Sequence, residues 1–248
     1  MLTRLNFTVL FSSVFFLSSH ALAVGKPVSQ EKIKTSIVKG AKFLYQSQNA
    51  TGWWSDSGLP ALTGLTLVAL EMADAKKLAA KYESERRRAY DYLTSLAKPD
   101  GSIHDGRLIN YNTACSLMAL SMANETRYRP LIEKARAYIA ASQIDLGEKG
   151  KQDNANDGGV GYNDKHDHSD MNNTLMAIEA MRMSESALRR KDQGKQPLKH
   201  DLDWKALEHF LASCQNLPEH SDNPNLSTQP KDRGGFIYHP GESKAGEV

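Results

Sequence analysis

One short pattern occurs four times along this chain of 248 residues. In its most complete copy, residues 39–54, a segment with helical periodicity ends near a Gln and is followed by a Gly-x-aromatic turn. The Gln position, separated by 49, 46 and 72 residues, is occupied in turn by Gln48, Ala97, Gln143 and Gln215. Recurrence at such an interval is typical of repeat proteins, in which each unit packs only on its neighbours. The sequence therefore predicts a repeat architecture.

Each copy begins with a helix that carries charges on one face, such as Glu133, Lys134 and Arg136 in the third copy, so we expect these first helices to face water. The copies share a basic–small pair: Lys39-Gly40, Arg88-Ala89, Lys134-Ala135 and Lys205-Ala206. Glycines in the turns, at positions 52, 101, 158 and 234, allow the positive φ angles that a tight reversal needs.

A second helical stretch of different character follows the first three turns. Residues 61–72, 111–123 and 171–181 contain almost no charge, which indicates helices buried on all sides. They align at Thr63, Thr113 and Thr174, and Asn112 and Asn173 stand before two of these threonines as possible N-caps. The predicted fold is all-α: an α/α toroid with two concentric layers of helices, forming an incomplete ring of about three and a half helix pairs.

The first 23 residues have the pattern of a cleaved signal peptide. Arg4 precedes a largely apolar run over residues 7–17, and Ala21-Leu22-Ala23 is a small-x-small cleavage site. The apolar run is shorter than the ~20 residues of a membrane span. We therefore expect export to the periplasm or outside a bacterial cell after cleavage near Ala23. Residues 24–248 would form the toroid repeat domain, continued by C-terminal repeats beyond this chain or covered by a partner at its open end.

Charge and cysteine content exclude some partners. Without Arg4 the chain has 30 basic and 29 acidic residues, a net charge of +1, which gives no reason to expect binding to nucleic acid. Cys115 and Cys214 lie in different predicted helices, so we favour two buried free cysteines over a disulfide. There is no C-x-x-C sequence to suggest a zinc or redox site.

The first copy, Lys39-Gly40-x-x-Phe43-Leu44-x-x-x-Gln48-x-x-x-Gly52-x-Trp54, resembles the Gln-Trp (QW) repeat of squalene and other triterpene cyclases. These enzymes belong to the terpenoid cyclase/protein prenyltransferase superfamily of α/α toroids. The resemblance covers about residues 30–240. It implies a barrel of inner helices inside a ring of outer ones, with a central apolar cavity that holds a polyisoprenoid in the cyclases.

The resemblance also places a candidate active site. Cyclases protonate their substrate with the middle Asp of an Asp-x-Asp-Asp-Thr motif, and the matching residues here are Asp170-Met171-Asn172-Asn173-Thr174. Both later acids of the motif are amides. Since an amide cannot act as a general acid, Asn172 removes the expected proton donor. Asp170 is then either the N-cap of the following helix or a remaining catalytic carboxylate at the mouth of the cavity.

Five further residues are candidates for lining the rim of the cavity and binding a ligand: Asn112, Thr113, Asn172, Asn173 and Thr174. For Asn112, Thr113, Asn173 and Thr174, helix capping is the alternative role. The segment His166-Asp167-His168-Ser169-Asp170 could ligate a transition metal, but a solvated capping loop is the favoured interpretation. We predict no metal and no cofactor. For Trp53 and Trp54, packing between repeats is favoured over ligand stacking.

Two functional hypotheses follow. The first is an exported cyclase-like toroid that binds an apolar, isoprenoid-like small molecule or a peptide at its central cavity without cyclase chemistry. The second is an active terpenoid cyclase or transferase that uses Asp170 on a polyisoprenoid. Export and the amide at position 172 favour the first, because polyprenyl substrates are made inside the cell.

Overall fold

The structure is a computed structural model that describes residues 28–73, 76–163, 168–189, 198–221 and 226–240. The predicted signal peptide lies outside the described residues. In the described part of the chain the regular structure is helical, apart from three isolated β-bridges at the turns. The predicted all-α fold is confirmed. None of the helices described is long and apolar enough to cross a membrane.

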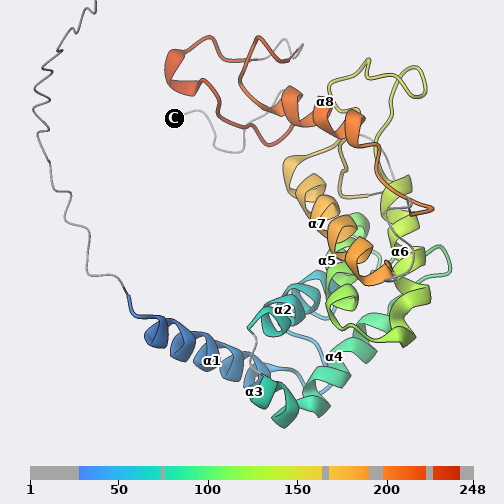
Figure 1. Ribbon diagram of the computed structural model, residues 1–248. Helices are drawn as coiled ribbons and strands as arrows, with labels where there is room; N and C mark the ends of the chain where they lie inside the picture. The colour runs from blue at the N-terminus through green and yellow to red at the C-terminus, as the bar shows by residue number, and fades with distance from the viewer. Residues whose placement is uncertain (1–27, 74–75, 164–167, 190–197, 222–225, 241–248) are drawn as a thin grey trace, which may run out of the picture.

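Eight α-helices and two 3₁₀ turns, η1 (Thr126–Tyr128) and η2 (Pro230–Asp232), make up the described structure. The α-helices are α1 (Gln30–Ser47), α2 (Pro60–Met72), α3 (Lys76–Lys81), α4 (Glu83–Ser95), α5 (Ile109–Met122), α6 (Arg129–Ala141), α7 (Met171–Leu188) and α8 (Trp204–Cys214). Figure 1 shows them along an open arc, with α1 and α8 at its two ends. The low-charge helices α2, α5 and α7 lie side by side, and the helices that begin each repeat lie outside them.

The four turns have the same backbone geometry. In each turn, the residue after the Gln position donates its N–H to the carbonyl of the residue that follows the glycine, over 2.8–2.9 Å. The glycine donates its own N–H to the carbonyl of that same residue after the Gln position. Gly52, Gly101, Gly158 and Gly234 all adopt φ between +81° and +105°. The inserts that lengthen the third and fourth copies therefore leave the turn itself unchanged. The glycines at positive φ were predicted from the sequence, and this prediction is confirmed.

A second constraint acts on these glycines from the next repeat. A Cβ on Gly52 would lie 2.4 Å from the carbonyl oxygen of Arg88 in α4, and one on Gly158 would lie 1.8 Å from that of Ala206 in α8. Gly101 meets Lys134 of α6 in the same way. Each turn thus packs backbone against the next outer helix, nine residues before that helix's Gln position. Ala206 is therefore the residue equivalent to Arg88 and Lys134, whereas the alignment of the sequence repeats paired Lys205 with them.

The repeated Gln explains how successive units are joined. The Gln48 side chain donates from Nε2 to the carbonyl of Gly52, 3.0 Å away in its own turn, and to that of Glu85 in α4, 2.8 Å away. The Gln143 side chain does the same to Gly158 and to Asp203, the N-cap of α8. One amide group therefore links the end of one repeat to the beginning of the next outer helix. The second turn has Ala97 at this position, so within the described structure this link is present at the first and third junctions.

The inner helices differ in burial from the prediction. In α5, every residue from Asn112 to Ser121 is buried, as expected for a helix between α2 and α7. In α2 and α7, which flank it, only one side is buried, and Met72 and Leu175 are 70% and 45% exposed. Burial on all sides is therefore correct for α5 and wrong for the other two, because neither has an inner helix on its second flank in the described structure.

Charge on the outer helices was also predicted to face water. Arg136 departs from this prediction most clearly, and Arg86, whose side chain is 15% exposed, departs from it in part. The Arg136 side chain is 2% exposed within the α6–α7 contact, whereas Glu133 on the same helix is exposed. Cys115 and Cys214 are both free and buried, which confirms the sequence prediction. Burial raises the pKa of each thiol to about 12, so neither is a reactive thiolate at neutral pH.

Candidate functional site

The aspartate of the cyclase-like motif begins α7. Asp170 has extended backbone angles, and its side-chain oxygens accept hydrogen bonds from the backbone N–H of Asn173 at 2.9 Å and from its Nδ2 at 2.7 Å. This is the geometry of an N-cap, in which a side-chain oxygen satisfies a free N–H of the first helical turn. Of the two roles left open by the sequence, the structure places Asp170 in the capping role. Its side chain is completely buried.

Two tyrosines from distant parts of the chain close over this aspartate. Tyr238, which follows the fourth turn, is hydrogen-bonded to Asp170, and its hydroxyl lies 3.2 Å from that of Tyr162. The backbone of Tyr238 also accepts the N–H of Met171 at 2.8 Å. Burial, the Tyr162 hydroxyl and the Asp170 carboxylate raise the pKa of Tyr238 well above its ordinary value. The phenol therefore stays neutral beside the carboxylate.

The aligned threonines hold the inner helices against the turns. Thr113 accepts the backbone N–H of Ile103 at 2.9 Å, and Thr174 accepts that of Val160 at 2.9 Å. Thr63 accepts the N–H of Trp54 in the same way, at 3.2 Å. All three side chains are fully buried. Thr113 and Thr174 were predicted to line a ligand-binding rim; the structure instead gives them a repeated structural role.

Of the three asparagines predicted to lie at the rim, two are buried and one is exposed. Asn112 is buried and links two helices: its Oδ1 accepts the N–H of Ala61 in α2 at 2.9 Å, and its Nδ2 donates to the carbonyl of Arg107. Asn173 is also buried, and its Oδ1 has no hydrogen-bond partner. Neither is an N-cap, because α5 begins after Leu108 and α7 after Asp170. Asn172 is exposed and is the one predicted rim residue of α7 that a ligand could reach.

The structure describes only part of the segment 166–170, which the sequence marked as a possible metal site. His166 and Asp167 lie outside the described residues. The ring of His168 stacks on that of His239, with centroids 5.1 Å apart, and Asp170 is occupied as described above. Among the residues that the structure describes, no three His, Cys, Asp or Glu side chains are grouped so that they could hold a metal ion. Trp54 is buried and donates its indole N–H to Leu44 of α1 at 2.8 Å, a packing role.

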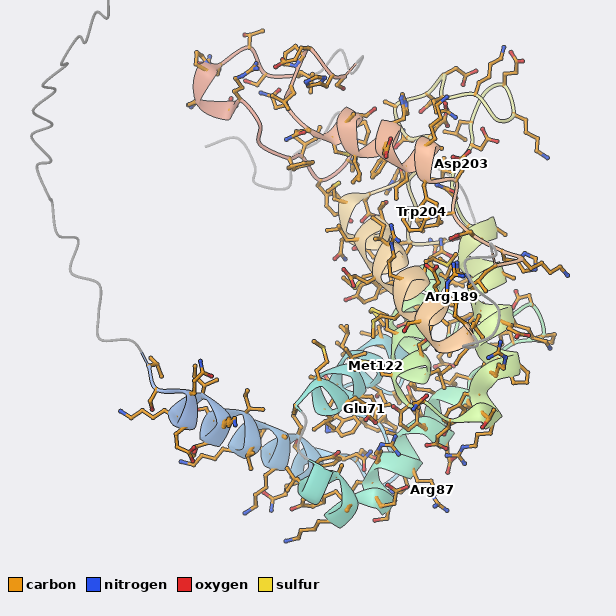
Figure 2. The ribbon with its side chains drawn as sticks, viewed as in Figure 1. Glu71, Arg87, Met122, Arg189, Asp203 and Trp204 are labelled. Atoms are coloured by element: carbon orange, nitrogen blue, oxygen red, sulfur yellow. The ribbon has the colours of Figure 1, made fainter. Side chains whose placement is uncertain are left out.

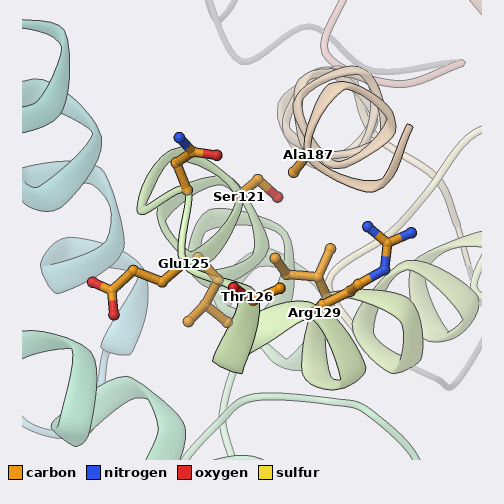
Figure 3. A pocket seen from close by; sticks show the side chains of 8 residues that line it. Ser121, Glu125, Thr126, Arg129 and Ala187 are labelled. Carbon is orange, nitrogen blue, oxygen red and sulfur yellow. The ribbon is translucent and has the colours of Figure 1, made fainter. Parts of the chain in front are cut away.

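A cleft of about 130 Å³ lies at the opposite ends of the inner helices, between α5, α7 and the beginning of α6 (Figure 3). The charged groups around it are already paired. Arg129 donates to the carbonyl of Leu188 at 2.6 Å and meets Glu133 at 3.3 Å, and Glu125 meets Arg127 at 2.7 Å. A second cleft, of about 160 Å³, lies under the polar insert of the third copy. No sequence motif marked either cleft.

Comparison of the chain with models of protein families, with curated proteins and with solved structures gives no match. The likeness to terpenoid cyclases therefore rests on the repeated sequence pattern. Chemically, the motif at residues 170–174 can cap a helix and anchor a turn. It offers no accessible acid, since its carboxylate has no exposed atom surface and already accepts several hydrogen bonds.

We expect Asp170→Ala to lower the free energy of unfolding by about 2–4 kcal/mol, from the lost cap and the buried donors of Asn173 left without an acceptor. Asp170→Asn keeps one acceptor oxygen and should retain part of that stability. Urea unfolding followed by circular dichroism measures both. A change below about 0.5 kcal/mol for Asp170→Ala, the size of a neutral surface substitution, would contradict the capping role.

Proposed function

We propose that this protein is a helical-repeat binding protein of the terpenoid cyclase-like toroid type that binds an apolar peptide segment on its inner face and carries out no cyclase chemistry. The observation that carries the proposal is the buried network of Asp170, Asn173 and Tyr238. A general acid must reach its substrate, and this carboxylate is committed to the structure of α7. The amide at Asn172, the exposed position of the motif, has no proton to give.

The inner helices supply an apolar surface for binding. In α2, four of the apolar residues that are partly buried or exposed recur at helical spacing and form one stripe: Leu62, Leu65, Ala69 and Met72. Since α4 and α5 pack on α2, we infer that this stripe lies on the side of the helix turned away from them, towards the inner side of the arc. Leu175 and Met176 continue an apolar surface on α7. Isolated apolar residues need no explanation on a protein surface, but an aligned stripe indicates a contact face.

Methionine is concentrated on these same helices. Of the eight methionines in the chain, seven lie in α2, α5 and α7: Met72, Met118, Met122, Met171, Met176, Met181 and Met183. Met122 and the neighbouring Glu71 mark the ends of α5 and α2 in Figure 2. The flexible, polarisable thioether is over-represented on surfaces that adapt to varied apolar partners. Met118 and Met181 are buried in the core, whereas the accessible methionines, Met72 above all, favour a binding surface that accepts related sequences over one shaped for a single rigid ligand.

The size of the clefts favours a peptide over an enclosed small molecule. Sites for drug-sized ligands are usually about 300–1,000 Å³ and bury most of the ligand. The two clefts described above, of about 130 and 160 Å³, are smaller and lined by polar groups. An apolar, isoprenoid-like small molecule on the same face is the second candidate, supported by the apolar stripe of α2. Catalysis on a polyisoprenoid through Asp170 is the third, supported only by the retained first Asp and the Thr of the motif.

The test is fluorescence anisotropy with a labelled amphipathic Leu/Ala peptide, carried out on the wild type, Met72→Glu and Leu175→Glu. Burying one such side chain on binding contributes about 1.5–3 kcal/mol, so we expect each substitution to weaken binding about tenfold or more. Val38→Glu, on the outer helix α1, is the matched control and should bind as the wild type does.

Displacement of the peptide by farnesol or squalene at low concentration would instead favour the small-molecule candidate. Incubation with squalene or a polyprenyl substrate, followed by mass spectrometry, tests catalysis. A cyclised product that disappears in Asp170→Asn would end the binding proposal. We also propose that the protein acts outside the cytoplasm, on the pattern of residues 1–23; an N-terminus mapped at Met1 in the mature protein would contradict export.

A further inference from the structure

Neighbouring repeats pack through an outer helix of one repeat and the glycine turn of the repeat before it. Each end of the arc exposes one of these two surfaces. Five residues before the Gln position, each outer helix carries an aromatic side chain. In the second, third and fourth copies it contacts the preceding repeat: Tyr92 donates to the carbonyl of Ser57 at 2.6 Å, and Tyr138 donates to Oδ1 of Asn110 at 3.1 Å. Phe210 packs over Gly159. The equivalent residue of α1, Phe43, is 68% exposed.

The whole face of α1 around Phe43 is exposed in the same way. Ile37 and Gly40 are exposed, whereas Ala89, Ala135 and Leu207, the equivalents of Gly40, are fully or nearly fully buried. Ile33, Ile37, Gly40 and Phe43 follow a helical spacing and form one stripe, which we call the head face. Val38 is the contrasting position: its equivalents in the other outer helices, Arg87, Glu133 and Lys205, are exposed as well. Every residue from position 28 to position 40 is exposed, and what distinguishes the head face is that Ile37, Gly40 and Phe43 have buried or partly buried equivalents in all three later outer helices.

The other end of the arc has the complementary half. Among the described residues, a Cβ on Gly234 would meet no atom within 4 Å, whereas Gly52, Gly101 and Gly158 each lie against the carbonyl of a following outer helix. Likewise Gln215 donates to its own turn, at Gly234, but within the described part of the chain it makes no bond to a following helix, unlike Gln48 and Gln143. We call this surface, formed by Gln215 and residues 234–236, the tail face.

We propose that two copies of this chain associate head to tail, with α1 of one copy packed on the fourth turn of the other as a following outer helix. By the register seen three times in the chain, Gly234 of one copy lies over the carbonyl of Lys39 of the other. Gln215 then donates to the carbonyl of Ser36, and Phe43 packs on Gly235. A second copy is the occupant because α1 is an outer helix with the required small residue, Gly40, and apolar stripe both open.

A contact of this kind is heterologous: the two surfaces that meet are different. Such contacts produce closed rings when the rotation between copies closes and open filaments when it does not. Since the described chain forms an arc (Figure 1), two copies joined at both ends form a ring. This association concerns the ends of the arc, and it stands whether or not the inner face binds a peptide.

The first experiment compares Phe43→Glu with Val38→Glu in the full-length protein by analytical ultracentrifugation over a range of concentrations. We expect the wild type and Val38→Glu to sediment as dimers or larger assemblies, and Phe43→Glu as a monomer. Both substitutions replace an exposed apolar residue of α1 by Glu, so a general effect of charge would change both. A wild-type protein that is monomeric at every concentration overturns the proposal.

The second experiment changes the tail face. Gly234→Asn places a side chain where the carbonyl of the partner's helix would lie, and asparagine tolerates the positive φ of this position. Gly106→Asn is the matched control, because Gly106 also has a positive φ and open space around it but lies in the second copy, away from both faces. Loss of assembly in Gly234→Asn and its retention in Gly106→Asn support the proposal.

Mixing the two variants distinguishes this contact from a symmetric one. Phe43→Glu keeps an intact tail face and Gly234→Asn keeps an intact head face, so an equimolar mixture should form heterodimers with one contact and grow no further. An α1–α1 contact would be lost in Phe43→Glu but kept in Gly234→Asn, and that result would overturn the proposal. So would a mixture in which both variants remain monomeric.

Discussion

Replacing Arg136 by methionine is expected to lower the free energy of unfolding by about 3–5 kcal/mol, because the hydrogen bonds of a buried, charged donor contribute about 1.5–3 kcal/mol each. The guanidinium donates to the carbonyl of Met181 at 2.5 Å and to Oγ of Ser184 at 2.9 Å in α7, and to the carbonyl of His200 at 2.7 Å. Its Nη2 also lies 2.9 Å from Asp201. Methionine fills a similar volume but donates to none of these oxygens, although the Met181 carbonyl keeps the hydroxyl of Ser184 as a donor.

The charge at this position is stable although burial lowers the pKa of Arg136, with Asp201 opposing that effect. An arginine side chain starts from a pKa above 12 and remains protonated in proteins. One residue therefore ties α6 to α7 and to the segment that leads into α8. Because these links cross between elements, we expect the substitution to destabilise the third and fourth repeats together.

Chemical denaturation of Arg136→Met, Arg136→Lys and Arg87→Met tests this expectation. Lysine keeps the charge but cannot reproduce the fork of donors, so it should fall between the wild type and methionine. Arg87, which is 63% exposed on α4, should change stability by less than about 0.5 kcal/mol. Equal effects of Arg136→Met and Arg87→Met would show that the buried bonds contribute little.

Arg136 also shows where sequence reasoning ends. On the sequence it belongs to the same charged run as Glu133 and Lys134, and its charge led to the prediction of a solvent-facing side chain, although its helical spacing from Ile132 and Ile139 places it on the buried face. Its four acceptors come from residues 45 to 65 positions away, and two of them are backbone carbonyls with no signature in sequence. By contrast the helices and the Gly turns followed from the repeat, because periodicity and φ requirements are local properties.

The candidate site likewise combines features that local sequence signals predict with features that depend on long-range contacts. The capping role of Asp170 was foreseen as one alternative because an Asp before an apolar helix is a local signal. The threonines were recognised as equivalent, but their acceptor role towards the turn requires knowing that each inner helix begins beside its own turn. Asn112 reaches Ala61, 51 residues earlier, and Tyr238 reaches Asp170 from the far end of the chain. Because of such long-range contacts, residues that were predicted to line a ligand-binding rim have structural roles in the described structure.

The second large effect is expected at a glycine, where the chain provides its own control. Gly158→Ala should lower the free energy of unfolding by about 2–5 kcal/mol, because alanine pays about 1–2 kcal/mol at positive φ and adds a clash of a further 1–3 kcal/mol. The clash arises because the new Cβ would lie 1.8 Å from the carbonyl of Ala206, a backbone atom of α8 that cannot turn aside.

Gly234→Ala isolates the first of these contributions. Gly234 has nearly the same φ, +81° against +89° for Gly158, and the same two backbone hydrogen bonds in its turn, but no atom lies within 4 Å of the position of its Cβ. It should therefore show only the backbone strain, when both variants are unfolded at concentrations at which the protein is monomeric. A difference of about 1 kcal/mol or more between the two variants measures the close packing of a turn on the next outer helix. If the two substitutions were equally destabilising, backbone approach between repeats would not be what requires glycine at Gly158.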